Sequence, residues 1–233
     1  MTEIPGVELR SRGLYLRDHR TLVVADLHIG RGFSAGVELP VDDAVTIDTH
    51  LEALLEHWNP RQVVLAGDVL DAFQTVPPGV QSRLESLIES IAACDASLEV
   101  LAGNHDVLLP SLVDETVRDD LRLGETIIAH GQAPVQEDAE RYIVGHQHPA
   151  VRIEGVKRPC YLVGPAPNGG TVIVLPAFSP ALRGTVMNRR RECDIDDSLL
   201  PDGALDRFRP VVWDAAAEEA LWFPAFANLR PFL

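Results

Sequence analysis

The first hundred residues alternate between short apolar runs and longer segments of helical periodicity. Apolar runs at residues 21–26, 62–66 and 98–102 predict strands that are buried on both faces. Between them, segments 41–58 and 77–93 carry apolar side chains three and four residues apart, which predicts two amphipathic helices. The order strand, helix, strand, helix, strand predicts an α/β fold with a parallel sheet and right-handed crossovers.

Short strands predominate in the rest of the chain. Two more are expected before residue 21, at 7–11 and 13–18. From Glu125 onward, turn residues separate predicted strands at 126–130, 142–146, 150–155, 160–164, 171–178, 210–214 and 220–224. Val211–Asp214 and Leu221–Phe223 are expected to form a closing hairpin. We therefore expect one domain over residues 1–233, with two packed sheets, the second mixed or antiparallel, and helices outside.

The composition is that of an ordinary globular protein, with 46% hydrophobic and 24% charged residues. The longest apolar runs have about eight residues, whereas a membrane span needs roughly 20, so no span is expected. Because the N-terminus lacks an apolar signal segment, the protein is expected in the cytoplasm. Cys94, Cys160 and Cys193 form no CxxC pair, which indicates reduced, inert thiols.

The chain is strongly acidic, with a net charge of −15, and Lys157 is the only lysine among 20 basic residues. This balance is typical of adaptation to molar salt, and a GC-rich genome that disfavours lysine codons is the alternative explanation. An acidic surface repels nucleic acid, but at about 1 M salt the screening length falls to about 3 Å. The charge therefore does not exclude a nucleic-acid substrate.

Five short polar strings follow predicted strands at the points where those strands end. The strings are DLH (26–28), GDVLD (67–71), GNHD (103–106), AHG (129–131) and GHQH (145–148). Because the carboxyl ends of parallel strands meet at one edge of a sheet, we expect their side chains to lie close together. Each string alone has an ordinary explanation, such as a turn or a hydrogen-bonded histidine, but the five in this order do not.

The side chains in these strings are carboxylates, an amide and imidazoles, without thiolates. The predicted metal ligands are Asp26, His28, Asp68, Asn104, His130, His146 and His148. This mixed set suits Mn, Fe or Zn better than calcium. With one shared carboxylate, it is enough for two ions about 3.5–4 Å apart. Two divalent ions, two carboxylates and a hydroxide leave about one positive charge, which favours a phosphoester substrate.

The series D-x-H, G-D-x-x-D, G-N-H-D, H-G and G-H-x-H resembles the calcineurin-like metallophosphoesterase superfamily over Asp26–His148. DLHIG, GHQHP and the later LPAFSP segment (Leu175–Pro180) resemble an archaeal branch of uncharacterised metallophosphoesterases, whose bacterial relatives are associated with DNA ligase. The resemblance implies a four-layer α/β/β/α sandwich. It also implies two divalent ions, Mn foremost, with Fe, Zn or Ni as alternatives.

The resemblance also implies a role for each residue. The implied ligands are Asp26, His28 and His148 for the first metal, Asn104, His130 and His146 for the second, and Asp68 for both. A hydroxide bridging the metals would attack phosphorus. His105 would donate a proton to the leaving oxygen. Asp71 would hold and polarise His105, because a nearby carboxylate keeps an imidazole protonated and so able to act as a general acid.

Some positions depart from the family pattern or are weaker candidates. Ala72 follows Asp71 where many relatives carry Arg, so no phosphate clamp is expected there. Asp106 replaces the Glu of phosphoprotein phosphatases, which weakens a protein-phosphatase assignment. The LPAFSP segment could line a substrate cleft or simply pack as an apolar loop. The same two alternatives hold for substrate contacts from Arg183, Gly184 and Asn188. Arg31 could reach a substrate phosphate and Arg189–Arg191 a polyanion, and the alternative for both is a solvated arginine.

Together, these features predict a cytoplasmic, metal-dependent phosphoric ester hydrolase. A phosphodiesterase acting on a nucleotide or nucleic acid is expected first, on family analogy, and a phosphomonoesterase second. A non-catalytic, metal-binding scaffold for protein interactions is a third alternative. A fourth is a module whose ligase-linked or DNA-repair partner supplies specificity. The sequence determines neither the native metal nor the oligomeric state.

Overall fold

The computed structural model describes residues 3–31, 42–71, 75–190, 200 and 203–230, with the backbone alone at 42–46. Its first sheet has six strands in the order β1-β2-β3-β4-β5-β6. These strands are β1 (Val7–Arg10), β2 (Gly13–Leu16), β3 (Thr21–Val24), β4 (Gln62–Ala66), β5 (Ser97–Leu101) and β6 (Val117–Arg118). The predicted parallel pairing of β3 with β4 and of β4 with β5 is confirmed.

The second half of the chain forms a seven-stranded sheet, order β16-β15-β12-β13-β9-β8-β7, and a three-stranded sheet, order β11-β10-β14. The larger contains β7 (Asp120–Leu123), β8 (Thr126–Ala129), β9 (Arg141–Val144), β12 (Tyr161–Pro165), β13 (Thr171–Val174), β15 (Arg209–Asp214) and β16 (Glu219–Trp222). The smaller contains β10 (Pro149–Ile153), β11 (Val156–Pro159) and β14 (Thr185–Val186). The predicted closing hairpin is the antiparallel pair β15–β16.

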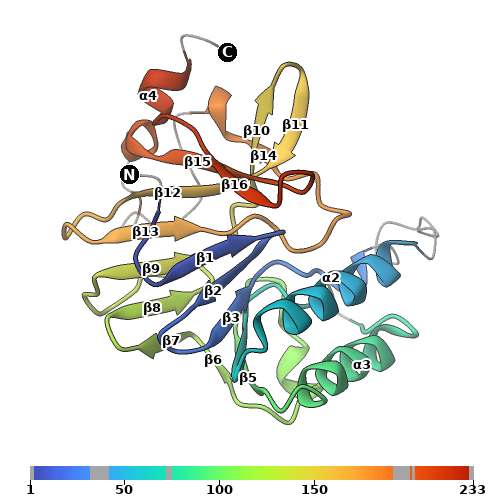
Figure 1. Ribbon diagram of the computed structural model, residues 1–233. Coiled ribbons are helices and arrows are strands. Elements are labelled where there is room, and N and C mark those ends of the chain that lie inside the picture. The colour runs from blue at the N-terminus through green and yellow to red at the C-terminus, as the bar shows by residue number, and fades with distance from the viewer. Residues whose placement is uncertain (1–2, 32–41, 72–74, 191–199, 201–202, 231–233) are drawn as a thin grey trace.

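The two predicted helices, α2 (Asp42–Trp58) and α3 (Val80–Ala92), lie together on one side of the first sheet (Figure 1). The second begins after the predicted Pro77 because Gly79, at φ 83°, forms a left-handed turn immediately before it. The other helices of the described residues are short: η1 (Leu109–Ser111), η2 (Met187–Arg189), η3 (Ala204–Arg207) and α4 (Phe226–Leu229). In the described parts of the chain, no helix combines the length and apolarity needed to cross a membrane.

Alternating side chains of the first sheet enter two different cores. Leu22 and Val63 pack with Leu51 and Leu84 from α2 and α3. Their neighbours in the strands point to the opposite face and meet the second sheet, in a core that includes Val23, Val64, Ile128, Ile143 and Ile173. Since successive side chains of a strand point to opposite faces, these strands are buried on both sides. The predicted packing of two sheets is therefore confirmed.

The outer face of the second sheet has a different cover from the first. Tyr142 and Leu162 pack there with Met187, Leu205 and Phe226, which come from η2, η3 and α4. Single turns of helix and the small sheet thus form the fourth layer of the α/β/β/α sandwich. Their segments are too short for a helical period to emerge from the sequence.

Candidate metal centre

The candidate ligands lie in loops that directly follow β3, β4, β5, β8 and β9. Backbone hydrogen bonds continue past the strand ends and hold these loops against one another. The N–H of Asp26 donates to Gly67 O at 3.0 Å, and the N–H of His28 donates to Asp68 O at 2.9 Å. On the second sheet, the N–H of Gly145 donates to His130 O at 3.0 Å. Between the sheets, the N–H of His146 donates to the carboxylate of Asp26 at 3.1 Å, so the loops from both sheets meet at one edge.

Several candidate ligands have a left-handed backbone, which non-glycine residues rarely adopt. The φ angles are 59° at Asp26, 48° at His28, 51° at Asp68, 66° at His146 and 46° at His148. Each such residue costs on the order of 1–3 kcal/mol and persists only where its surroundings hold it in place. The sharp turns aim these side chains back across the strand ends. Strain of this kind, concentrated in one place, is typical of functional sites.

Two motif glycines are required by the close approach of neighbouring loops. A Cβ at Gly103 would lie 2.1 Å from the backbone nitrogen of Asp68. A Cβ at Gly145 would lie 2.6 Å from Ala25 Cβ and 2.9 Å from Asp26 Oδ2. Both distances are shorter than non-bonded contacts allow. The glycines of GNHD and GHQH therefore let the loops come close enough for their side chains to converge.

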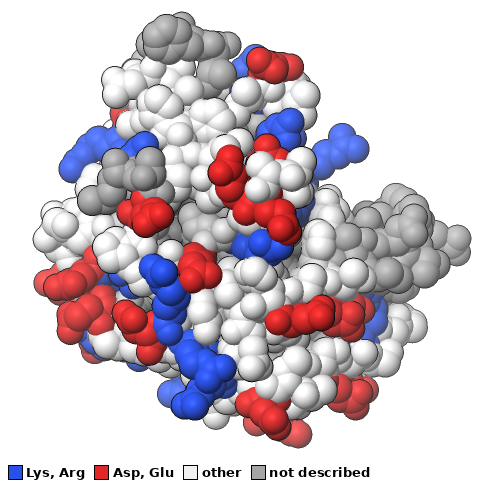
Figure 2. Space-filling view, in the orientation of Figure 1, with Lys and Arg blue, Asp and Glu red and all other residues white. Residues whose placement is uncertain are grey.

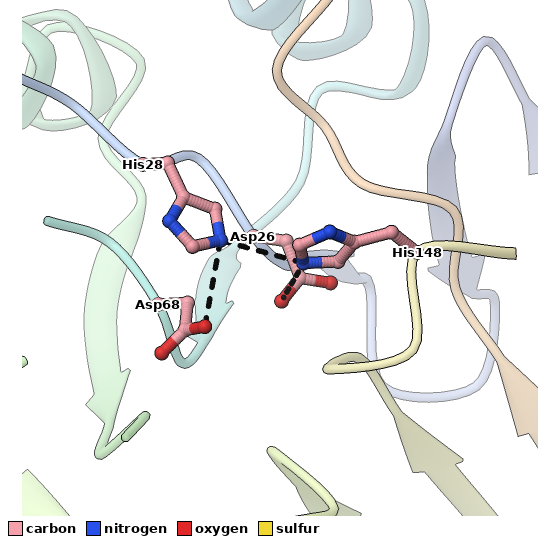
Figure 3. Close-up of side chains that lie close together, drawn as sticks. All are labelled: Asp26, His28, Asp68 and His148. Carbon is pink, nitrogen blue, oxygen red and sulfur yellow. Dashed lines mark hydrogen bonds and ion pairs between the residues drawn. The ribbon is translucent and has the colours of Figure 1, made fainter. Parts of the chain in front are cut away.

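One group of convergent side chains consists of Asp26, His28, Asp68 and His148, whose candidate ligand atoms all lie within 4.8 Å of one another. Nε2 of His28 lies 3.3 Å from Nε2 of His148 and 3.4 Å from Asp68 Oδ2 (Figure 3). Nε2 of His148 lies 3.1 Å from Asp26 Oδ1. Asp26, His28 and Asp68 are buried, and His148 is partly open to solvent. This group therefore surrounds a small polar space with donors of the type that bind divalent ions.

Asp68 also belongs to a second group, with His130 and His146. Nδ1 of His130 lies 3.0 Å from Ala66 O, and because a carbonyl only accepts, this nitrogen carries the proton. In the neutral ring, Nε2 then offers a lone pair. It is buried, lies 3.4 Å from Asp68 Oδ2 and has no hydrogen-bond partner in the described structure. Two lone pairs that face each other in this way fit a cation between them.

The pKa shifts of His28, His146 and Asp68, which come from both groups, favour metal binding, whereas the shift of His130 opposes it. Burial lowers the pKa of His28 to about 4 and lowers that of His146, so both rings are neutral near pH 7 and able to bind metal. Burial opposes ionisation of Asp68, but His130 and the His105 N–H outweigh it and lower the pKa of Asp68 to about 2. Burial likewise opposes a charge on His130, yet the two nearby carboxylates raise its pKa.

The residues predicted as proton donor and its partner also lie together. His105 Nδ1 is 3.0 Å from Asp71 Oδ1, and the His105 N–H donates to Asp68 Oδ1 at 2.9 Å. Nε2 of His105 lies 4.0 Å from Asp68 Oδ2, and the ring is about a quarter exposed, at 27%. The imidazole is thus fixed at one nitrogen and directs the other toward the edge of the cluster.

Asn104 and Asp106 complete the GNHD loop in different ways. Asn104 is exposed at the end of β5, next to His105. Asp106 is buried and accepts hydrogen bonds from three backbone N–H groups, those of Val69, Leu70 and Gly103. Asp106 therefore ties the GDVLD loop to the GNHD loop. Sequence reasoning did not assign this role, because the same short acidic side chain in a turn also suits solvent.

The LPAFSP segment supports the metal centre from behind. The N–H groups of Phe178 and Ser179 donate to the carbonyls of Ala25 and Asp26, at 2.8 and 3.3 Å. Nη1 of Arg12 donates to the carbonyls on either side of Phe178, 3.1 Å from Ala177 O and 2.6 Å from Ser179 O. The segment is buried from 172 to 179, so the packing alternative is confirmed.

The other weaker candidates lie in several places. Asn188 is buried and holds both the N–H and the C=O of Arg152, which is a structural role. Arg31, Arg183, Arg189 and Arg190 are exposed, and Gly184 is partly buried. Ala72, Arg191 and Cys193 lie outside the described residues. Cys160 is buried and Cys94 half-buried, and both are free thiols.

Comparison with known proteins extends these observations. Residues 19–133 match a family model described as calcineurin-like phosphoesterase. No curated protein matches the chain. Nuclease MPE from Pseudomonas putida is 23% identical, with 93% of this chain and 94% of that chain covered and a TM-score of 0.63. The phosphoesterase YfcE from E. coli is 12% identical, with 88% and 98% covered and a TM-score of 0.43. The likeness to nuclease MPE confirms the fold class.

Proposed function

We propose that the chain, which matches the calcineurin-like phosphoesterase family model over residues 19–133, hydrolyses phosphodiester bonds in a nucleotide or nucleic acid. The chain is a metal-dependent phosphoester hydrolase, as the family match and the clustered His and Asp side chains indicate. The finer proposal of a diesterase follows from charge. A diester carries one negative charge. It matches the net charge of about +1 on a centre of two divalent ions, two carboxylates and one hydroxide.

One observation supports a centre of two ions above all others. Asp68 belongs to both ligand groups, and its Oδ2 lies 3.4 Å from His28 Nε2 on one side and 3.4 Å from His130 Nε2 on the other. A carboxylate in this position is able to join two ions at the spacing of about 3.5–4 Å found in binuclear hydrolases. Asn104 is proposed as a further ligand from its place in the GNHD loop, beside His105.

In the proposed reaction, this chain's own residues position and move protons. When bound, two divalent ions supply an activated water and neutralise charge that develops on the phosphoryl oxygens. His105 donates a proton from Nε2 to the leaving oxygen. Asp71, at 3.0 Å from Nδ1, fixes the orientation of the ring. The hydrogen bond from the His105 N–H to Asp68 couples the proton donor to the ligand cluster.

Manganese is the proposed native ion, and Fe, Zn and Ni share its preference for nitrogen and oxygen ligands. The Pseudomonas putida protein of the same fold is a nuclease, which makes nucleic acid the first substrate class to test.

The diesterase proposal predicts a preference between two simple aryl substrates. With Mn bound, kcat/KM for bis(p-nitrophenyl) phosphate should exceed that for p-nitrophenyl phosphate by about tenfold or more, because the single negative charge of the diester matches the net charge of the proposed centre. Release of p-nitrophenolate measures both rates, and EDTA provides the blank. Faster hydrolysis of the monoester would assign the chain to the phosphomonoesterases instead.

A further inference from the structure

The small sheet β11-β10-β14 gathers cations on a protein that is otherwise acidic. Arg152 on β10 pairs directly with Lys157 on β11, so their side chains share one face of the hairpin. Arg183 precedes β14, which pairs with β10. Figure 2 shows Lys and Arg atoms beside the β10–β11 hairpin, at the upper right of the molecule. We call Arg152, Lys157 and Arg183 the hairpin cations.

The hairpin cations lie next to the metal centre. β10 begins directly after His148, and His148 O accepts a hydrogen bond of 2.7 Å from the Thr185 N–H. The backbone of Gly184 packs so closely on His148 that a Cβ there would lie 2.5 Å from His148 O. The ammonium of Lys157 donates to Gly184 O. The only lysine of the chain is therefore held against the segment that contacts a predicted metal ligand.

The three positive charges repel one another. Burial, and then the charges of Arg152 and Arg183, lower the pKa of Lys157. In the part of the chain that the structure describes, the ion pairs of arginine involve other residues, Arg10, Arg17, Arg118, Arg122 and Arg230. Like charges brought together in this way raise the free energy of the folded protein, and an anion that binds among them lowers it.

The backbone beneath these cations is held firmly. The side chain of Asn188 accepts from the Arg152 N–H at 3.1 Å and donates to Arg152 O at 3.0 Å. The guanidinium of Arg152 donates to Gly155 O at 2.8 Å. Beyond Arg152, the same hairpin borders a cavity of about 640 Å³, whose lining includes Arg189 and Phe223. The hairpin thus leads from the metal centre to a hollow of suitable size for a nucleotide, lined by Arg152, Arg189 and Arg230 together with Glu154.

From this arrangement, we propose that the hairpin cations bind the phosphate backbone of a nucleic-acid strand and guide it from the cavity into the metal centre. The inference rests on the proposed diesterase function and adds a class of substrate, a polynucleotide rather than a mononucleotide. Phosphate contacts position a strand without reading its sequence, so cleavage should depend little on sequence. The net charge of −15 opposes binding of the strand elsewhere on the protein.

The test compares two substrates on the same Mn-loaded proteins. The variants are Arg183→Gln and Lys157→Gln/Arg183→Gln, and the matched control is Arg17→Gln/Arg61→Gln. Arg61 is exposed where β4 begins, and its N–H donates to Arg20 O beside the β2–β3 turn, so the control lies at the opposite edge of the sheet from the metal centre. The substrates are a labelled single-stranded DNA of roughly 20 nucleotides and bis(p-nitrophenyl) phosphate, whose single phosphate leaves no further phosphates for the hairpin cations to bind.

The double variant should lower kcat/KM for the DNA by about tenfold through KM and leave that for the aryl diester within about twofold. The slope of log(kcat/KM) for DNA against log salt should become shallower by about 0.7 for each lost contact. Lys157→Arg, which keeps the positive charge, should retain the wild-type slope. Equal DNA cleavage by wild type and the double variant, or an equal loss on both substrates, would overturn the inference. Failure of wild type to cleave the aryl diester would instead overturn the proposed function.

Discussion

Substitution of Asp68 by asparagine is expected to lower hydrolysis of bis(p-nitrophenyl) phosphate by about 10³-fold or more and to remove tightly bound metal. Asp68 is shared by the two ligand groups, so its loss affects both sides of the centre at once. An asparagine has the same shape and is still able to accept the hydrogen bond from the His105 N–H, so the fold should be retained. Metal analysis after Mn loading and gel filtration gives the bound stoichiometry.

His148→Ala provides the comparison, because His148 belongs to one group only. That variant should keep the ion held by the second group, whereas Asp68→Asn should weaken both. Urea unfolding of each variant without metal separates lost ligation from lost stability. Two ions per chain in Asp68→Asn, together with normal turnover, would show that Asp68 does not bridge a metal pair.

His105→Ala should retain the full metal content and lose most activity on substrates with poor leaving groups. General acid catalysis contributes about 10²–10⁴-fold, and an alkoxide needs a proton to depart, whereas p-nitrophenolate hardly does. We therefore expect a loss of about 10²-fold or more on an alkyl phosphodiester and a much smaller loss on bis(p-nitrophenyl) phosphate. Steady-state rates on both substrates, with metal content measured on the same samples, give the comparison.

Asp71→Asn tests whether Asp71 acts through His105 as a positioning residue. It should reproduce part of the His105→Ala loss on the alkyl substrate, and it should add little when combined with His105→Ala. Unchanged hydrolysis of the alkyl phosphodiester by His105→Ala would remove His105 from the mechanism. A proportional loss on both substrates would indicate a disturbed metal centre rather than a missing proton donor.

The strands that carry the centre were predictable because each combines a buried run with a polar end. β3 and β4 are almost wholly apolar, β5 ends in the buried pair Val100–Leu101, and the parallel pairing of these strands brings Asp26, Asp68 and His105 to one edge of the sheet. The strict spacing within GDVLD and GNHD supplied the rest. Local pattern and the geometry of parallel strands therefore contain most of the information that positions these side chains.

Contacts between segments far apart in the chain were not predictable in this way. The bond from the Phe178 N–H to Ala25 O and the Arg12 contacts behind it join three distant segments. Nothing in the residue pattern indicates which carbonyl a buried arginine will reach. Short strands such as β6 and β14 likewise form because neighbouring backbone groups are available, since their two residues are too few for a periodic signal.

The most direct test of the two-ion centre is anomalous diffraction from crystals of the protein grown with Mn. We expect two anomalous peaks about 3.5–4 Å apart, one between His28, Asp26 and His148 and one beside His130 and His146, with Asp68 between them. A single peak, or peaks remote from Asp68, would contradict the binuclear centre on which the proposed hydrolysis depends.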